Sequence, residues 1–271
     1  MARIPKKVAE RLTQQLKTFQ DVLESAKSRD VNESDTVTII TDMLADLFGF
    51  NKYTEVTSEQ AIRGTYCDLA VTIEGTIKYL IEVKAIGLTL NDNHLRQAVN
   101  YGANHGITWV VLTNGIVWEI YRIKFEKPIK HELVCSTNLL ELNHRKSDDL
   151  DPLFLLCKEG LDKAAIEEFH AHSQIVNRFI IAALIQSESS LSLIRRELRR
   201  ISPNSKVSIE EIGELLPDVL KRDVLEGDEA DAALKTVKKS AQRTLRKKRK
   251  KETSTSSDAE TTDSKSDSTE E

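Results

Sequence analysis

The chain has 271 residues, of which 39% are hydrophobic, so it can bury the core of at least one globular domain. Its longest apolar runs, such as "FIIAALI" at 179–185, fall well short of the roughly 18 to 20 residues that span a bilayer. We therefore expect a soluble cytoplasmic protein with no membrane partner. Three cysteines without a Cys-x-x-Cys pair argue against a zinc ribbon and a disulfide framework.

The net charge of −4 is unevenly distributed along the sequence. Residues 235–251 hold ten Lys or Arg and no acid, whereas residues 252–271 hold seven acids and one Lys. The basic segment is predicted to attract a polyanion, and the acidic segment to weaken that attraction. Residues 252–271 also lack any large apolar side chain, so we expect a disordered, acidic, Ser/Thr-rich tail.

The N-terminal third alternates between two helical patterns and a group of short strands. Apolar residues at spacings of three and four predict helices over 5–28 and about 34–48. Runs that favour strands follow at 53–57, 66–73 and 77–86. The last two runs are separated by Glu74-Gly75-Thr76, which predicts a hairpin.

A further helix and two more strands complete the predicted core. The helical pattern returns at 92–105, and strands on either side of Asn114-Gly115 indicate a second hairpin. A strand near 132–142 is also expected. This order predicts an α/β core over 30–145, a mixed central sheet in which a helix crosses between strands, preceded by an N-terminal helix within 1–29.

The C-terminal part is predicted to be helical. Helical patterns cover 151–158, 161–186, 189–200 and shorter pieces between 208 and 225. We divide this part into a helical region at 146–227, for dimerisation or DNA contact, a basic helical segment at 228–251, and the tail at 252–271.

Two acids are expected to meet at one end of the first hairpin. Side chains alternate along a strand, so Glu82 and Lys84 share one face of "IKYLIEVKAI", while Ile81 and Val83 point into the core from the other. In the partner strand Asp68 lies on the polar face, and Cys67 is assigned to the apolar face. Two neighbouring carboxylates with water are the ligands that a hard cation such as Mg²⁺ prefers.

Lys84 adds a cation one strand repeat beyond Glu82. A metal bound by Asp68 and Glu82 would activate water and stabilise charge on a phosphate, and the ammonium of Lys84 would assist both. The pattern therefore predicts phosphodiester hydrolysis with Mg²⁺ or Mn²⁺. Taken alone, Glu-x-Lys is more often an ordinary ion pair on a surface strand.

The combination of motifs resembles the PD-(D/E)xK nuclease superfamily. Asp68, a gap of 13 residues and Glu82-Val83-Lys84 match its bipartite signature, and "QAVNY" at 97–101 is similar to the Gln-x-x-x-Tyr motif of its type I restriction enzyme R-subunit branch. The resemblance covers about 28–123 and implies a restriction-endonuclease-like fold that acts on DNA as an endonuclease.

The resemblance also implies roles for residues outside the central motif. Glu33 would be a third metal ligand from the first core helix, and Gln97 and Tyr101 would touch DNA or brace the site. The loop "AIRGTY" offers Arg63 to a phosphate. For each of these four residues an ordinary structural role is the alternative.

Two departures from the family pattern affect these expectations. Cys67 replaces the proline of the motif, and the chain carries no Gly-x-x-x-x-Gly-Lys-Ser/Thr loop, so it cannot drive translocation with ATP by itself. Restriction or defence with partner subunits is therefore one expected context. The alternative function is a catalytically silent nucleic-acid-binding or assembly protein with the nuclease fold.

Overall fold

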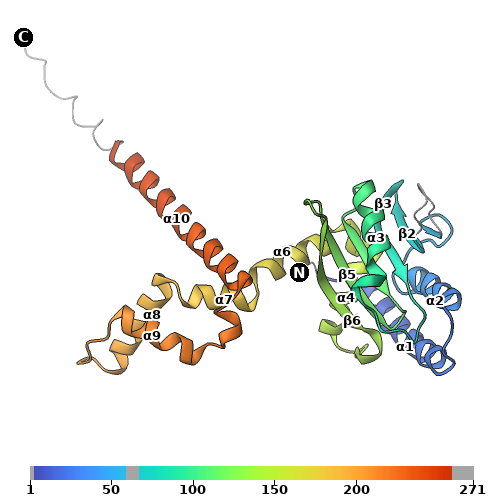
Figure 1. Cartoon of the computed structure of the whole chain (residues 1–271), viewed down its shortest axis with the longest axis horizontal. Helices are drawn as coiled ribbons and strands as arrows, with labels where there is room; N and C mark the ends of the chain where they lie inside the picture. The colour runs from blue at the N-terminus through green and yellow to red at the C-terminus, as the bar shows by residue number, and fades with distance from the viewer. Residues whose placement is uncertain (1–2, 59–66, 258–271) are drawn as a thin grey trace, which may run out of the picture. The chain divides into compact units, whose positions relative to one another are not determined.

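The computed structural model describes residues 3–58 and 67–257, and the chain divides into two compact units, Met1–His172 and Ser173–Glu271 (Figure 1). The first unit holds the sheet and the second is helical throughout its described part. The mixed α/β fold with a helical C-terminal region is therefore as predicted.

A single six-stranded sheet organises the first unit. Its strands follow one another in sequence order across the sheet, and all neighbours are antiparallel except β3 and β4. The strands are β1 (Val56–Ser58), β2 (Leu69–Ile73), β3 (Thr76–Val83), β4 (Trp109–Thr113), β5 (Val117–Lys124) and β6 (Lys130–Asn138).

The parallel pair requires a crossover, which α3 (Asp92–His105) supplies. The side chain of Asn91 caps the first turn of this helix, and Gly106 ends it with a left-handed backbone at φ 70°. The predicted helix and its crossing between strands are confirmed. In the sequence, α3 is therefore the next element after β3, the strand that holds Glu82.

Helices cover both faces of the sheet (Figure 1). On one face, α1 (Lys6–Ser28) and α2 (Glu33–Asp46) pack with Tyr79, Ile81 and Val83 of β3. On the other face, α3 packs with Leu80, Val110 and Leu112. The alternation along β3 was predicted, but both of its faces are buried, because α3 covers the side expected to be polar.

The β2–β3 hairpin turns through two residues with positive φ, Glu74 at 51° and Gly75 at 76°. Such a turn matches the right-handed twist of the strands and fixes their register. Leu69 pairs with Ile81, so Asp68 and Glu82 are the next positions outward from the turn. The pairing shifts by one residue at a β-bulge between Val71 and Thr72, so the turn and the bulge together set which acids face each other.

The first unit is larger than the predicted core at 30–145. The main hydrophobic cluster includes buried residues of α1 together with Leu150, Phe154 and Ile166, which lie beyond the sheet in sequence. The helical elements after β6 are η1 (Leu139–Glu141), α4 (Ser147–Leu156), α5 (Lys158–Asp162) and α6 (Ala165–Ile175). One core therefore joins the N-terminal helix, the sheet and these helices.

The second unit consists of short helices and one long helix. The prediction of one helix over 161–186 is wrong, because Asn177 caps a new helix by accepting hydrogen bonds from the backbone of Phe179 and Ile180. The elements are α7 (Arg178–Ile185), α8 (Glu188–Ile201), α9 (Ile209–Val219), η2 (Arg222–Val224) and α10 (Asp228–Ser257).

The end of α10 corrects one more boundary. The helix reaches Ser257, so residues 252–257 are helical rather than disordered as predicted, and 258–271 lie outside the described residues. No helix in the described part of the chain is long and apolar enough to cross a membrane.

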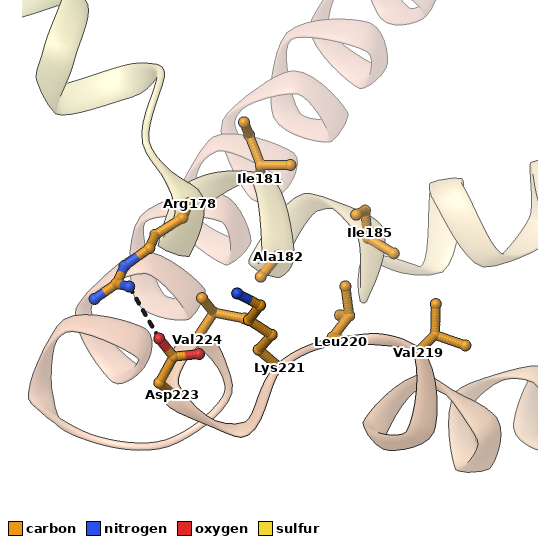
Figure 2. Close-up of a pocket in the computed structure, with 9 residues that line it drawn as sticks. All are labelled: Arg178, Ile181, Ala182, Ile185, Val219, Leu220, Lys221, Asp223 and Val224. Atoms are coloured by element: carbon orange, nitrogen blue, oxygen red, sulfur yellow. Dashed lines mark hydrogen bonds and ion pairs between the residues drawn. The ribbon is translucent and has the colours of Figure 1, made fainter.

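A pocket of about 440 Å³ opens within the second unit (Figure 2). Its walls are mostly apolar, with Ile181, Ile185 and Val219 among them. At one side Arg178 forms an ion pair with Asp223 at 2.9 Å. This pair links α7 to η2. Apart from it, Lys221 is the remaining charged residue in the lining, so the lining residues form no cluster of catalytic side chains.

Candidate active site

Four charged side chains converge near the end of β3. Glu82 lies within β3 and Lys84 directly follows it, Asp68 directly precedes β2, and Glu33 is the first residue of α2. The backbone N–H of Lys84 donates to the carbonyl of Thr113 at 2.9 Å, which extends the pairing with β4 past the end of the strand. The sheet therefore fixes the backbone of both Glu82 and Lys84.

Asp68 is anchored by the strand that carries Glu82. Its Oδ2 accepts a hydrogen bond from the backbone N–H of Val83 at 2.7 Å. This bond holds the carboxylate beside the Glu82–Lys84 segment, where the hairpin register also places it. Asp68 and Glu82 are thus brought together by the turn and the bulge of the β2–β3 hairpin.

Lys84 lies between two carboxylates. Its Nζ is 2.8 Å from Oε1 of Glu82 and 3.6 Å from Oε2 of Glu33. Burial lowers the pKa of Lys84, but the hydrogen bond and the charge of Glu82, helped by Glu33 and Asp68, outweigh it and raise the pKa overall. The ammonium is therefore retained and holds α2 to the end of β3.

The position of Glu33 follows from the cap of its helix. Asn32 accepts a hydrogen bond from the backbone N–H of Asp35 at 2.9 Å and so caps α2 directly before its first residue, Glu33. An acid in the first turn is favoured by the helix dipole as well as by Lys84. The side chain of Glu33 remains 48% exposed, so it lies at the open side of the cluster.

Glu82 is the most buried acid of the group, with 5% exposure. Burial raises its pKa to about 7; the hydrogen bond from Lys84 opposes this shift, and the charges of Asp68 and Glu33 add to it. Its Oε2 is buried and has no hydrogen-bond partner among the described residues. The carboxylate therefore has an unused acceptor in a region with more negative than positive charge.

These features fit a bound divalent cation held by two carboxylates rather than three. The described residues contain no group of three or more His, Cys, Asp or Glu side chains that could hold a metal ion. The predicted set of Asp68, Glu82 and Glu33 is not assembled, because Lys84 lies between Glu33 and Glu82 and attracts both. Asp68 and the unused Oε2 of Glu82 remain suitable hard ligands.

Cys67 lies on the other side of the sheet from the one predicted. It belongs to the cluster beneath α3 with Ala70 and Leu80, because the chain bends at Asp68 before β2 begins. Its Sγ donates to the carbonyls of Leu69 and Ile81. Burial, followed by the charges of Glu82 and Asp68, raises its pKa to about 12, so Cys67 is a thiol and not a nucleophile.

Tyr101 and Gln97 occupy different environments on α3. Tyr101 has no exposed surface and stacks on His105 with ring centroids 4.4 Å apart. Its hydroxyl is buried without a hydrogen-bond partner in the described part of the chain, and burial, with a contribution from Cys67, raises its pKa. Gln97 is exposed. Tyr101 is therefore a packed side chain of α3 and Gln97 a surface one, and their roles at the site or on DNA stay predictions.

Asn114 supports the site and was interpreted from the sequence only as part of a turn. Its amide donates to the carbonyls of Ile86 and Leu88, at 3.3 and 2.9 Å, and its oxygen accepts from the backbone of Ile116 and Val117. This side chain ties the segment after Lys84 to the β4–β5 turn. Arg63, the remaining predicted residue, lies outside the described residues.

Comparison with known proteins gives one match. Residues 49–134 match the family model of the type I restriction enzyme R protein N terminus. No curated protein and no solved structure gives a significant match. The matched segment includes Asp68, Glu82, Lys84, Gln97 and Tyr101, whereas Glu33 lies before it. The resemblance predicted from the motifs is thus confirmed for residues 49–134, which match the N-terminal domain of the type I restriction enzyme R protein.

Proposed function

We propose that this protein is a Mg²⁺- or Mn²⁺-dependent endonuclease that hydrolyses phosphodiester bonds in DNA, in the cytoplasm and in a restriction or defence context. The observation that carries the proposal is the pairing of Asp68 with Glu82 beside Lys84, within a segment that matches a restriction enzyme domain. The match points to a nuclease-like role, and the charged cluster supports a hydrolytic one.

Asp68 and Glu82 would hold the metal ion, which when bound would activate water and neutralise charge on the scissile phosphate. Asp68 is oriented by the N–H of Val83, so its carboxylate needs little rearrangement. Lys84 would stabilise the negative charge that develops on the phosphate. Glu33 would hold that ammonium in place from α2, as a positioning residue.

Cleavage of plasmid and single-stranded DNA tests the proposal. Wild type, Asp68→Ala and Lys84→Ala are compared in Mg²⁺ and in Mn²⁺, with EDTA as the metal-free control. Each substitution is expected to lower the rate by roughly 10² or more, the scale of such electrostatic contributions. Equal activity in all three proteins would rule out this site as the source of cleavage.

Direct measurement of Mn²⁺ binding separates the metal site from turnover. Titration calorimetry is expected to show binding to the wild type and to Lys84→Ala, and strong loss in Asp68→Ala. The variant Glu33→Gln serves as a comparison, since Glu33 is placed beside Lys84 rather than in the two-carboxylate set. Equal Mn²⁺ affinity in Asp68→Ala and the wild type would contradict the ligand assignment.

A second candidate is a non-catalytic nucleic-acid-binding or assembly subunit with the same fold. The observation in its favour is the 2.8 Å ion pair between Lys84 Nζ and Oε1 of Glu82, which neutralises the cation that catalysis would use. This second candidate function predicts that the wild type shows no metal-dependent cleavage. It also predicts salt-sensitive DNA binding that the Asp68→Ala variant retains. A motor subunit on another chain, or a second copy of this one, would then be the partner to seek.

A further inference from the structure

The long helix α10 contains a surface that the candidate active site does not use. It runs over 30 residues, Asp228–Ser257, and its exposed cations begin one turn after an acidic first turn. Five of these cations are exposed side chains: Lys235, Lys238, Lys239, Arg243 and Arg246. The sequence continues with five more cations at 247–251.

The opposite side of α10 is apolar and buried. Ala230 and Ala233 are 3% and 4% exposed, and Leu234 and Val237 are partly buried. These positions recur at spacings of three and four, and α10 packs against α7 of the same unit. The packing fixes which side of the helix faces solvent.

The five exposed cations therefore form one surface, which we call the cationic face of α10. At 100° per residue their mean direction is about 165° from that of the apolar stripe, and they extend over roughly 16 Å of helix. None of them forms an ion pair with an acid in the described part of the chain. By contrast, Arg196 and Arg200 of α8 are both paired with Glu197.

We propose that the cationic face of α10 binds the phosphate backbone of double-helical nucleic acid without reading its sequence. Several cations in a row on a rigid helix displace several counterions from a polyanion at once, which makes binding favourable and strongly dependent on salt. The proposal deepens the endonuclease function and rests on it for the identity of the duplex as substrate DNA. Binding itself can be measured without cleavage.

The composition of α10 favours a duplex over other polyanions. Residues 228–257 contain no Phe, Tyr or Trp, so the helix has no platform on which single-stranded bases could stack. A helix that lies on a membrane inserts a large apolar face, whereas the apolar stripe of α10 is made of small and medium side chains buried against α7. Regularly spaced phosphates on a rigid double helix suit this surface better.

Fluorescence anisotropy of the full chain in EDTA tests the proposal. The test variant changes Lys235, Lys239, Arg243 and Arg246 to Gln, which preserves helix propensity while removing four charges. The matched control changes Lys6, Lys7, Lys17 and Lys27 of α1 to Gln, because these are exposed on another long helix and remove the same charge. Circular dichroism checks that both proteins keep their helices.

The test variant is expected to bind two duplexes of unrelated sequence at least about tenfold more weakly than the wild type near 100 mM salt. The slope of log K against log salt is expected to fall by about 3 to 4, close to 0.9 for each phosphate that the variant no longer neutralises. The control is expected to stay near the wild type. The wild type is expected to bind the duplex in EDTA whether or not it cleaves DNA in Mg²⁺, so a failure of the endonuclease proposal is distinguished from a failure of this one.

Three results would overturn the proposal. Equal loss of affinity in both four-charge variants would reflect net charge rather than the cationic face. Unchanged affinity in the test variant would place the duplex elsewhere. Tighter binding of single-stranded DNA, or of phosphatidylserine vesicles, than of the duplex would assign the surface to a different ligand.

Discussion

Glu82 bears an energetic cost in the folded chain because its carboxylate is buried and faces other acids. Its pKa is raised from an ordinary value of 4.5 to about 7, primarily by burial. Between these two values the folded state binds more protons than the unfolded state, so the free energy of unfolding falls as pH rises through this window. Above about pH 7 the whole cost is present.

Replacing Glu82 by Gln is therefore expected to stabilise the chain at alkaline pH. In EDTA at pH 8 the free energy of unfolding should rise on the order of 3 kcal/mol, because the raised pKa already includes the opposing hydrogen bond from Lys84. At pH 4.5, where Glu82 is protonated, the variant and wild type should be nearly equal. Urea melts at both pH values check this, and a difference that does not change with pH would contradict it.

Arg11 and Glu159 form an ion pair that is expected to stabilise the fold more as pH rises, which is the opposite of the pH dependence expected from Glu82. Both terminal nitrogens of Arg11 lie 2.8 Å from the carboxylate oxygens of Glu159, and the pKa of Glu159 is lowered mainly by this hydrogen bonding, with burial opposing it. A carboxylate whose pKa is lower in the folded chain than in the unfolded chain stabilises the fold at pH values above its unfolded-state pKa. This stabilisation is lost as pH falls through its folded-state pKa.

Glu159→Gln is expected to cost about 1 kcal/mol at pH 7, a value discounted because the pair is partly exposed. The deficit should shrink as pH falls below the ordinary pKa of a glutamate and through the lowered pKa of Glu159, since the wild-type carboxylate then becomes protonated too. Glu10→Gln is the control, because Glu10 forms only an exposed pair with Lys6 at 3.9 Å. Thermal melts from pH 7 into the acid range measure the effect, and a deficit that does not shrink with falling pH would refute the assignment.

At the scale of elements, α3 can cover the site face of the sheet because it approaches closely at Gly102. A Cβ at this position would lie 2.6 Å from Cδ1 of Ile123 and 3.2 Å from the carbonyl oxygen of Ile107. The second contact is with backbone and cannot move aside easily. The position of α3, and with it Tyr101, therefore depends on the missing side chain.

Gly102→Ala is expected to destabilise the first unit by about 1 to 3 kcal/mol through overpacking, despite the better helix propensity of Ala. Gly213→Ala in α9 is the matched control, because a Cβ there meets nothing within 4 Å. The control should gain roughly 0.5 to 1 kcal/mol locally. Denaturant melts compare the two, followed by tryptophan fluorescence for the first unit, which holds Trp109 and Trp118, and by circular dichroism for the helices of the second. A stabilising Gly102→Ala would contradict close packing of α3.

Local signals explain which elements could be predicted. The bounds of α3 follow from its apolar spacing, the Asn91 cap and Gly106, all of which act within one turn of the helix ends. The apolar pattern over 161–186 predicts one continuous helix, whereas the cap at Asn177 starts a new one. Periodicity alone does not record where a cap interrupts a helix.

In the charged cluster, too, some contacts could be predicted from local sequence patterns and others could not. The two-residue period of strands and the turn at Gly75 predicted that Asp68 and Glu82 would be neighbours and that Glu82 and Lys84 would share a face. The contact of Lys84 with Glu33, the cover over Glu82 and the support from Asn114 join segments far apart in sequence. Such contacts depend on the tertiary fold, so no local pattern encodes them.

For the whole molecule, the two units differ in how much apolar surface they bury. The first has one large cluster that spans α1, the sheet and the helices up to α6. The cluster of the second is centred on only three buried residues, Leu191, Ile212 and Leu216. Since burial of apolar area is the main stabilising term, the second unit is expected to be the less stable of the two.

Thermal unfolding of the full chain is therefore expected to show two transitions, with the second unit melting first. A truncated chain of residues 1–172 should retain the higher transition at an unchanged temperature, because the main cluster lies within it. Calorimetry of both chains measures this. A single shared transition, or loss of folding in the truncated chain, would mean that the units depend on each other.

The same truncated chain separates cleavage from attachment to DNA. It keeps Asp68, Glu82 and Lys84 but lacks the cationic face of α10. At saturating DNA and low salt its cleavage rate should equal that of the full chain, whereas its affinity for duplex should be weaker and less sensitive to salt. A truncated chain that cleaves slowly even at saturation would instead show that the second unit contributes to the chemical step.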